Sequence, residues 1–194
     1  MRYRIVPAKN NEVHTAMIAC AIVEAIGPEI AQQLAGSPDN LPLVYSVFAS
    51  LAAREDTQYS YRNALIALDS DDEIAGVVVS YDGSRLHELR RPFIEAANGI
   101  LGTEFDEATM ADETSADEIY LDSLCVFGPY RGEGLGRKLV EAAAKQHKSS
   151  GKPLGLLVDY DNPGARSLYV KLGFKSVGER PFAGTVMEHM QLVD

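Results

Sequence analysis

This chain of 194 residues has little of what disulfide scaffolds and nucleic-acid-binding proteins need. Its only two cysteines, Cys20 and Cys125, both lie in apolar runs, so we interpret them as small buried side chains rather than as a disulfide framework. Basic residues are outnumbered by acidic ones, 18 to 28, which gives a formal net charge of −10. Because a phosphate backbone needs a basic protein face, this balance argues against nucleic acid as a partner.

Long apolar segments are also lacking. The first twelve residues, MRYRIVPAKNNE, have no apolar core of the kind that a signal peptide carries. We find no run that approaches the roughly 18 apolar residues of a membrane-spanning helix. Four histidines share no metal-ligand spacing, namely His14, His87, His147 and His189. These absences predict a cytoplasmic protein with no membrane partner and no metal, and the acidic charge is compatible with a cationic acceptor such as an amine.

Apolar periodicity and turn residues predict an alternation of strands and helices. The expected strands are residues 2–6, 61–68, 74–81, 118–127, 153–160, 174–179 and 185–193. The expected helices are residues 13–26, 43–55, 84–100, 135–150 and 162–173. The first of these helices should end near Gly27-Pro28. No repeat or long linker divides the chain, so we predict one mixed α/β domain over residues 1–194.

One glycine-rich stretch, YRGEGLGRK, stands between a predicted strand and a predicted helix. A helix N-terminus leaves backbone N–H groups unpaired and carries about half a positive charge. Gly132, Gly134 and Gly136 would let a phosphate approach these N–H groups closely. Arg131 and Arg137 add positive charge at either end. The stretch therefore predicts a pyrophosphate-binding loop.

Two common nucleotide-binding motifs do not fit this stretch. A Walker loop needs G-x-x-x-x-G-K-S/T, which does not occur in the sequence. The dinucleotide fingerprint G-x-G-x-x-G, counted from Gly132, puts Arg137 where the third glycine belongs. The spacing that remains, Arg131-x-x-Gly134-x-Gly136, matches R/Q-x-x-G-x-G/A. In this spacing the chain resembles the cofactor loop of the GNAT superfamily of N-acetyltransferases.

The flanking segments strengthen this resemblance. Upstream, the family pattern L-A-V-x-P-x-Y-R-G compares with LCVFGPYRG at residues 124–132. Downstream, the family has a strand, an asparagine, a short helix with alanine and tyrosine, and then Gly-Phe. The corresponding residues here are GLLVDYD, Asn162, Ala165, Tyr169 and Gly173-Phe174. The specific resemblance covers about residues 118–180, and the order of elements agrees more loosely upstream.

The resemblance implies a mixed, mostly antiparallel central sheet flanked by helices, with splayed fourth and fifth strands. In that family the pantetheine arm of acetyl-CoA lies between these two strands like an added strand, and the diphosphate sits on the glycine-rich loop. The implied cofactor-binding residues are Leu124, Cys125, Val126, Arg131, Gly132, Glu133, Gly134, Leu135, Gly136, Arg137 and Asn162. Asn162 contacts the cofactor or the neighbouring strand, or it caps the helix that follows it.

The resemblance also implies direct transfer of the acetyl group to a primary amine in a ternary complex. This reaction needs a base for the amine proton and an acid for the leaving thiolate. Tyr169 is the implied acid, and an aromatic core residue is the alternative. Asp122 is our candidate base, because a carboxyl among apolar neighbours has a raised pKa; a structural aspartate is the alternative. Glu118 is a weaker candidate, and strand alternation predicts Asp122 and Leu124 on one face.

The sequence departs from the family between the third and fourth strands, which a tight turn commonly joins. Here about 35 residues, 82–117, intervene. This insert contains Asp106, Glu107, Asp112, Glu113 and Asp117. We hypothesise that it shapes an acceptor pocket for a cationic group or a subunit contact, as in a homodimer; a disordered acidic loop is the alternative.

Other functions remain open at this point. The acceptor is a small molecule, a peptide N-terminus or a lysine, and nothing in residues 8–60 distinguishes among them. Within enzymes, a larger acyl group and a hydroxyl acceptor are further alternatives. A catalytically silent acyl-CoA sensor or regulatory protein is the alternative outside enzymes.

Overall fold

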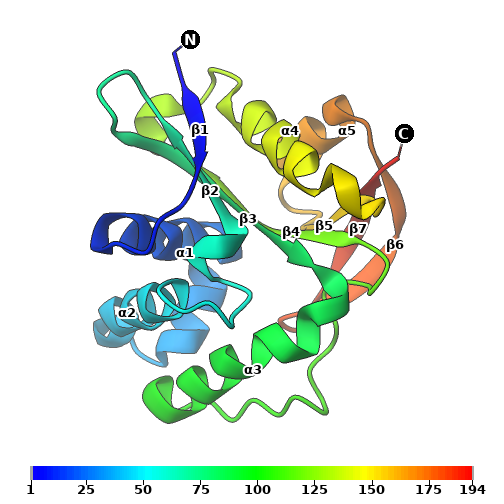
Figure 1. The fold of residues 1–194 in the computed structure, drawn as a ribbon. Coiled ribbons are helices and arrows are strands. Elements are labelled where there is room, and N and C mark those ends of the chain that lie inside the picture. Colours follow the sequence, from blue (N-terminus) through cyan, green and yellow to red (C-terminus); the bar gives the residue numbers. More distant parts are fainter. Residues whose placement is uncertain (1, 194) are drawn as a thin grey trace.

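A central sheet of seven strands organises the chain, for which the computed structural model describes residues 2–193 (Figure 1). The strands are β1 (Arg4–Pro7), β2 (Ala64–Leu68), β3 (Ile74–Asp82), β4 (Ile119–Val126), β5 (Leu154–Val158), β6 (Phe174–Phe182) and β7 (Thr185–Leu192). Their order in the sheet is β1-β2-β3-β4-β5-β7-β6. Neighbouring strands are antiparallel except for β4 and β5. This is the mixed, mostly antiparallel sheet that the resemblance implies.

Helices cover both faces of the sheet. They are α1 (Glu12–Ala35), α2 (Leu41–Ala52), α3 (Leu86–Ala96), α4 (Leu135–His147) and α5 (Pro163–Leu172). Helices α1, α2 and α3 lie on one side, and α4 and α5 lie on the other (Figure 1). Ile22 of α1 and Phe48 of α2 belong to the first core, and Leu139 of α4 and Tyr169 of α5 belong to the second. The apolar stripes of the helices therefore bury two cores against the two faces of one sheet.

Helix α1 shows how local chemistry sets an element's bounds. Asn11 caps its N-terminus, because the Asn11 side chain accepts a hydrogen bond of 2.9 Å from the His14 N–H. Gly27 has a φ of 81°, so the helix is interrupted where the sequence predicts its end. The prediction is wrong beyond that point, because Pro28 fits the first turn of a helix and the chain continues helically to Ala35.

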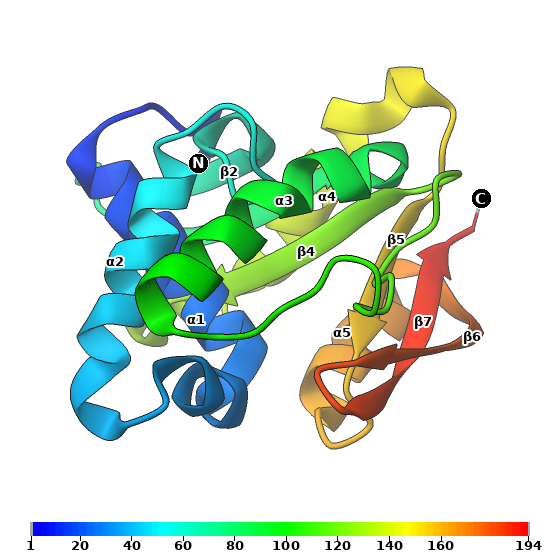
Figure 2. The ribbon, with the colours of Figure 1, turned by 90° about the horizontal axis from the view of Figure 1, so that it is seen from below.

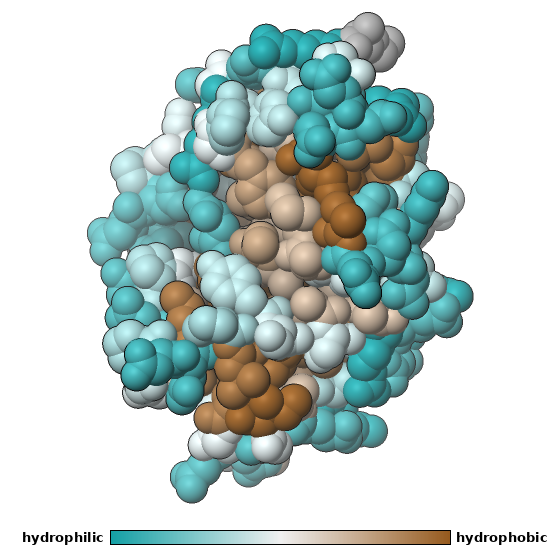
Figure 3. Space-filling view, turned by 90° about the vertical axis from the view of Figure 1, so that its left-hand side faces the viewer, coloured by the Kyte–Doolittle hydropathy of each residue, from teal (hydrophilic) through white to brown (hydrophobic). Residues whose placement is uncertain are grey.

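By length and composition alone, α1 is apolar enough to cross a membrane, with a mean hydropathy of 1.4 in its most apolar window. The sequence prediction that no segment approaches this composition is therefore wrong. Core helices of folded domains pass the same test, and Ile18 and Ile22 of α1 are completely buried in the first core. Figure 3 shows the side on which α1 and α2 lie, where hydrophobic side chains gather between hydrophilic ones.

Strands β4 and β5 separate soon after they meet. Their only paired residues are Ile119 with Leu154 and Tyr120 with Gly155. From Leu121 onward, β4 keeps β3 as its neighbour and has no strand on its other edge. Figure 2 shows β4 and β5 diverging from this meeting point. The splayed pair that the resemblance implies is present, and it leaves a slot beside the second half of β4.

A β-bulge lies within β4 at Asp122. Val79 of β3 is opposite Ser123, and the next residue of β3, Ser80, is opposite Leu121, so Asp122 is the extra residue. An extra residue reverses the alternation of the side chains that follow it. Leu124 consequently packs toward the α4 core, as Leu121 does. The prediction that Asp122 and Leu124 share a face is therefore wrong.

Candidate active site

The free edge of β4 forms one wall of the slot. Its residues Leu124 and Val126 are half-buried, and Cys125 between them is buried in the opposite core. Backbone N–H and C=O groups on an unpaired strand edge are available to an extended ligand. Burial raises the pKa of the Cys125 thiol to about 11, so this cysteine stays protonated at neutral pH. The three residues therefore offer a backbone surface rather than a nucleophile.

The glycine-rich loop leads directly into α4. Gly132 and Gly134 have φ values of 80° and 76°, in the left-handed region that favours glycine. Gly134 is the N-cap of α4 and provides no side-chain cap, so the backbone N–H groups of Leu135, Gly136 and Arg137 start the helix without that partner. Such N–H groups at a helix N-terminus suit an anion.

Gly136 has a different role from the other two glycines. A Cβ atom at this position would lie 3.3 Å from the Leu168 side chain of α5. Arg137 also joins these helices, since its Nη2 donates to the Lys171 carbonyl at 3.4 Å, and its Nη1 lies 3.6 Å from the Glu141 carboxylate. The residues of this first turn therefore bring α4 and α5 together.

Side chains of the loop attach it to distant elements. The Arg131 guanidinium donates to the Val126 carbonyl at 2.8 Å and pairs with Glu24 of α1. The Tyr130 hydroxyl donates to Asp69 at 2.9 Å, in the turn between β2 and β3. These contacts hold the start of the loop against the end of β4.

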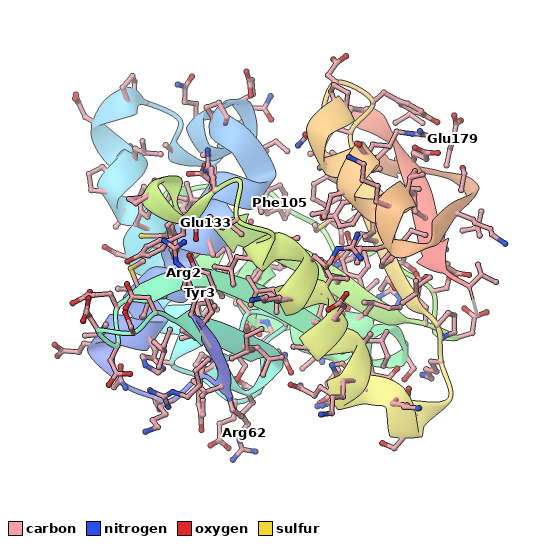
Figure 4. The ribbon with its side chains drawn as sticks, turned by 90° about the horizontal axis from the view of Figure 1, so that it is seen from above. Arg2, Tyr3, Arg62, Phe105, Glu133 and Glu179 are labelled. Atoms are coloured by element: carbon pink, nitrogen blue, oxygen red, sulfur yellow. The ribbon has the colours of Figure 1, made fainter. Side chains whose placement is uncertain are left out.

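Glu133 is directed toward β1 rather than toward the slot. Its carboxylate accepts a hydrogen bond from Tyr3 and lies 2.9 Å from the Arg2 guanidinium. Figure 4 shows Arg2, Tyr3 and Glu133 next to one another. Because its side chain is bound to the two residues before β1, Glu133 can contribute its backbone to the predicted phosphate site.

Asn162 caps helix α5. Its side-chain oxygen accepts a hydrogen bond of 3.0 Å from the Ala165 N–H, and Pro163 occupies the first turn. Of the roles considered for this residue, the cap is the observed one. A contact between Asn162 and a cofactor stays a prediction.

Asp122 stands at the bulge, where β4 has left β5. Its carboxyl is largely buried and accepts a hydrogen bond of 2.7 Å from the Ser123 hydroxyl. Burial raises its pKa to about 7, and the negative charge of Glu113 adds to this effect, whereas hydrogen bonds from Ser123 and Gln58 oppose it. A carboxyl with this pKa exchanges its proton near neutral pH, as a general base must.

Glu118 precedes β4 and behaves differently, although it is completely buried. Burial alone would raise its pKa, but several hydrogen bonds lower it to about 2. The partners are His189 Nε2 at 2.8 Å, Gln191 Nε2 at 2.7 Å, the Thr114 hydroxyl at 2.7 Å and the Ser115 N–H at 2.9 Å. This carboxylate joins the start of β4 to β7 and to the insert, which is a structural role.

Tyr169 is buried on α5, with its ring centroid 5.5 Å from that of Phe174. Burial raises the pKa of its hydroxyl to about 12, so the group holds its proton at neutral pH. Among residues 2–193 the hydroxyl has no hydrogen-bond partner, and it is not one of the unpaired polar atoms that are sealed from solvent. Tyr169 thus combines a place in the core with a free proton donor.

The insert is ordered, so the interpretation as a disordered loop is wrong. It forms α3, a π-helical segment (Ala97–Leu101) and a loop that passes below β4 toward β7 (Figure 2). Its loop borders a groove of about 800 Å³ lined by His87, Asp106, Glu107, Ala108, Met110, Ala111, Asp112, Arg180 and Pro181. Of the five predicted acids, Glu113 is buried instead, and Asp117 lies outside the groove.

Sequence reasoning missed Gln58 and Arg90, whose side chains contact Glu113. Arg90 had a detectable signal, since it falls at helical spacing among Leu86, Leu89 and Phe93, on the apolar side of α3. Gln58 follows α2 in an irregular segment and gives no such signal. Within residues 2–193, no three His, Cys, Asp or Glu side chains are grouped to hold a metal ion.

Comparisons with known proteins agree with this geometry. The profile of the acetyltransferase (GNAT) family matches residues 39–174. A crystal structure of an acetyltransferase is 30% identical, covers 97% of both chains and has a TM-score of 0.73. An N-acetyltransferase from Staphylococcus aureus Mu50 is 19% identical with a TM-score of 0.75, covering 97% of this chain and 99% of its own.

A third structure, of histone acetyltransferase HPA2 and related acetyltransferase from Corynebacterium glutamicum ATCC 13032, is 20% identical. It covers 99% of this chain and 96% of its own, with a TM-score of 0.70. Among curated proteins, no sequence matches significantly. The matched profile spans most of the chain, including β4, the glycine-rich loop and α5. This protein therefore belongs to the GNAT family of acetyltransferases.

Proposed function

We propose that this protein is an N-acetyltransferase that moves the acetyl group of acetyl-CoA to a primary amine in a ternary complex. Membership of the family supports acyl transfer in general. The observation that carries the proposal is Asp122, a carboxyl with a pKa of about 7 at the point where β4 leaves β5 and its edge becomes free.

The residues at the start of α4 fit the diphosphate of acetyl-CoA. Gly134 leaves the first backbone N–H groups of the helix without a side-chain cap, and a diphosphate supplies the acceptors and negative charge that such groups favour. Arg131 and the backbone of Leu124 and Val126 would extend the site along the slot. Acetyl-CoA, when bound, supplies an activated thioester.

Asp122 would act as the base in this reaction. A lysine-like amine with a pKa near 10 is mostly protonated at pH 7, and making it neutral costs about 4 kcal/mol. The Asp122 carboxylate would take that proton before attack, and the neutral nitrogen would then bond to the acetyl carbon and lose its second proton to water as the amide forms. Tyr169 would donate its proton to the departing sulfur as the carbon–sulfur bond breaks, because its hydroxyl is protonated and unpaired.

The acceptor site proposed here is the groove between the insert and the β6–β7 hairpin. Asp106, Glu107 and Asp112 line it and favour a cationic acceptor, and its volume of about 800 Å³ is in the range of small-molecule sites. A subunit contact through the same insert is the other role that we proposed from its sequence. Acidic-to-amide substitutions in the groove distinguish these roles. A rise in the acceptor KM would indicate acceptor binding, and a change in the mass of the assembly would indicate a subunit contact.

A thiol-release assay with acetyl-CoA and a panel of amines tests the proposal. We expect release that depends on an amine, together with heat on calorimetric titration with acetyl-CoA. Binding without thiol release for any amine would favour a regulatory acyl-CoA sensor. No binding, and no effect of charge reversal at Arg131 and Arg137, would contradict the proposal. Release with alcohols or with longer acyl-CoA substrates would change the acceptor or acyl group assigned.

A further inference from the structure

The groove between the insert and the β6–β7 hairpin contains an arginine that no carboxylate of residues 2–193 pairs with. Within these residues, ten of the eleven arginines form an ion pair with an aspartate or a glutamate, and Arg180 of β6 is the exception. Acidic residues outnumber basic ones by 28 to 18, so carboxylates are not scarce. Arg180 is partly buried and lines the groove, which places an unpaired positive charge there.

Neutral groups hold the Arg180 guanidinium in place. Its Nε donates to His189 Nδ1 and its Nη1 donates to the Asp112 carbonyl, each at 3.4 Å, and its Nη2 donates to the Ser115 hydroxyl. A guanidinium has five N–H donors, so one N–H on each terminal nitrogen has no partner among residues 2–193. Two such N–H groups match the two oxygens of a carboxylate. Arg180 is therefore oriented in advance for a carboxylate that a ligand would bring.

The acids of the same groove differ in whether a cation neutralises them. Asp112 lies 3.4 Å from Arg90, and Glu107 lies 3.5 Å from Arg91. Asp106 is exposed and forms no ion pair within residues 2–193, and one of its oxygens accepts a hydrogen bond of 3.0 Å from a backbone N–H two positions later. A solvent-exposed aspartate is ionised at neutral pH. Its second oxygen is thus available to a cation.

The groove lies near the end of β4 where the slot begins. Arg180 donates to His189, and His189 Nε2 lies 2.8 Å from the carboxylate of Glu118, the residue directly before β4. Strands β4 and β5 separate after Tyr120, and Asp122 follows two positions later. The phosphate loop comes after the opposite end of β4. A ligand on Arg180 would therefore lie toward the end of the slot that holds Asp122.

Arg180 and Asp106 line one groove without pairing with each other. A cation and an anion in this state match a ligand that carries both charges, because each charge then gains a partner when it loses water. We propose that the groove binds the zwitterionic head group of an amino acid, with the α-carboxylate on Arg180 and the α-ammonium on Asp106. This inference rests on the proposed function, and it assigns the acceptor to the free diamino acids.

The head group itself does not supply the reacting amine. An ammonium held by a carboxylate keeps its proton, because the opposite charge stabilises the charged form. A protonated nitrogen has no lone pair with which to attack a thioester. The acetyl group would therefore go to a second amine, on the side chain, as in lysine. The amide bond forms at that nitrogen and the carbon–sulfur bond breaks, with the proton transfers assigned above to Asp122, water and Tyr169.

The test is a calorimetric titration of the full-length protein with three probes of one chain length. L-Lysine carries a side-chain amine and both charges of the head group, 1,5-diaminopentane lacks the carboxylate, and 6-aminohexanoate lacks the α-ammonium. Coenzyme A is present throughout, and because it has no acetyl group, no transfer disturbs the titration. We expect lysine to bind about ten- to a hundredfold more tightly than either other probe, which is the usual gain from one hydrogen-bonded charge.

Two variants assign the two charges. Arg180→Gln should weaken lysine and 6-aminohexanoate by about that factor and leave 1,5-diaminopentane unchanged. Asp106→Asn should weaken lysine and 1,5-diaminopentane and leave 6-aminohexanoate unchanged. A purely structural role of either residue would weaken all three probes alike, and would contradict the inference. Lys175→Gln on β6 and Asp117→Asn on the insert are the matched controls, since both residues are exposed and lie outside the groove.

Equal affinities for lysine and either of the other probes would overturn the inference. This comparison uses the unmodified protein, so it decides the matter even if Arg180→Gln does not fold. Thiol release from acetyl-CoA separates the inference from the proposed function. Release with 1,5-diaminopentane as fast as with lysine would leave the acetyltransferase and remove the head-group site. The expected order of affinities, without release for any amine, would leave the head-group site and remove the proposed function.

Discussion

The two ends of β4 show how one strand can hold two carboxyl groups in opposite states. Glu118, just before the strand, lies where β4 pairs with β5, and its pKa is lowered to about 2. Asp122 lies four positions later, where β5 has left, and its pKa is raised to about 7. Burial raises the pKa of both groups. At Glu118 four hydrogen bonds outweigh the effect of burial on the pKa, whereas at Asp122 burial and the negative charge of Glu113 prevail.

The source of the donors explains why the two sites differ. Glu118 receives hydrogen bonds from β7 and from the end of the insert, which converge where the two halves of the sheet meet. Asp122 lies on the free part of the strand, where Ser123 donates a hydrogen bond to it and where burial and the negative charge of Glu113 raise its pKa. The arrangement around Glu118 stabilises a permanent carboxylate that links parts of the fold, and the arrangement around Asp122 suits proton transfer.

The largest effect should come from removing the Asp122 carboxyl. Asp122→Asn should lower kcat by about 10² to 10⁴-fold, which is the usual contribution of a general base. Its affinity for acetyl-CoA should not change, because the phosphate loop is untouched. Thiol release and calorimetric titration measure the two quantities. Asp71→Asn, in the exposed turn before β3, is a matched control, and undiminished turnover in Asp122→Asn would assign the base elsewhere.

At the other end of the strand, Glu118→Gln should mainly lower the stability of the folded protein. Loss of the buried charge and of its hydrogen bonds should lower the free energy of unfolding by about 3 kcal/mol. The unmodified protein should lose this contribution as the pH falls from about 5 to about 2, because the folded pKa lies below the unfolded one. Urea unfolding at several pH values tests both points. A variant as stable as the unmodified protein at pH 7 would show that the Glu118 carboxylate does not stabilise the fold.

A more local test is Gly155→Ala. A Cβ atom at this position would overlap the Glu118 carboxylate, which fills the space next to the glycine. We expect a loss of about 2 kcal/mol of stability, as for other overpacked sites. Gly151→Ala is not a suitable comparison, because its φ of 69° makes alanine unfavourable without any contact. Gly99→Ala, where a Cβ meets nothing within 4 Å, is the control, and equal melting temperatures for the two variants would contradict the expectation.

The smallest effect is the pH dependence of the unmodified enzyme. Because the pKa of Asp122 is about 7, its carboxylate form should disappear as the pH falls through that value. We expect kcat/KM to fall about tenfold for each pH unit below it. A rate profile from pH 5 to 9 measures this limb. A limb centred near 4 would indicate that Asp122 has an ordinary pKa and that the contrast with Glu118 has no role in the reaction.

The sequence predicts those parts of the site that depend on residues close together in the chain, and it misses parts that depend on distant residues. The glycine-rich loop, the strand before it and the cap at Asn162 are local patterns, and the structure contains all three. The bulge at Asp122 is not marked by glycine or proline, so strict alternation gave the wrong face for Leu124. Two of the donors to Glu118, His189 and Gln191, lie more than 70 positions away, which no short motif describes. Cofactor contacts, the single domain and a cytoplasmic location stay predictions.

The meeting of Glu118 with Gly155 also has a mechanical consequence. Within the sheet, two residue pairs connect β4 to β5, so the angle between the two halves is fixed at that junction. From Tyr120 to Val126 the strand extends about 20 Å at roughly 3.3 Å per residue. A rotation of about 3° at the junction would therefore displace the far end of β4 by about 1 Å, a distance that can cost about 10²-fold in rate. The Glu118 carboxylate, which contacts Gly155 and two residues of β7 at this junction, thus helps to set the spacing across the slot.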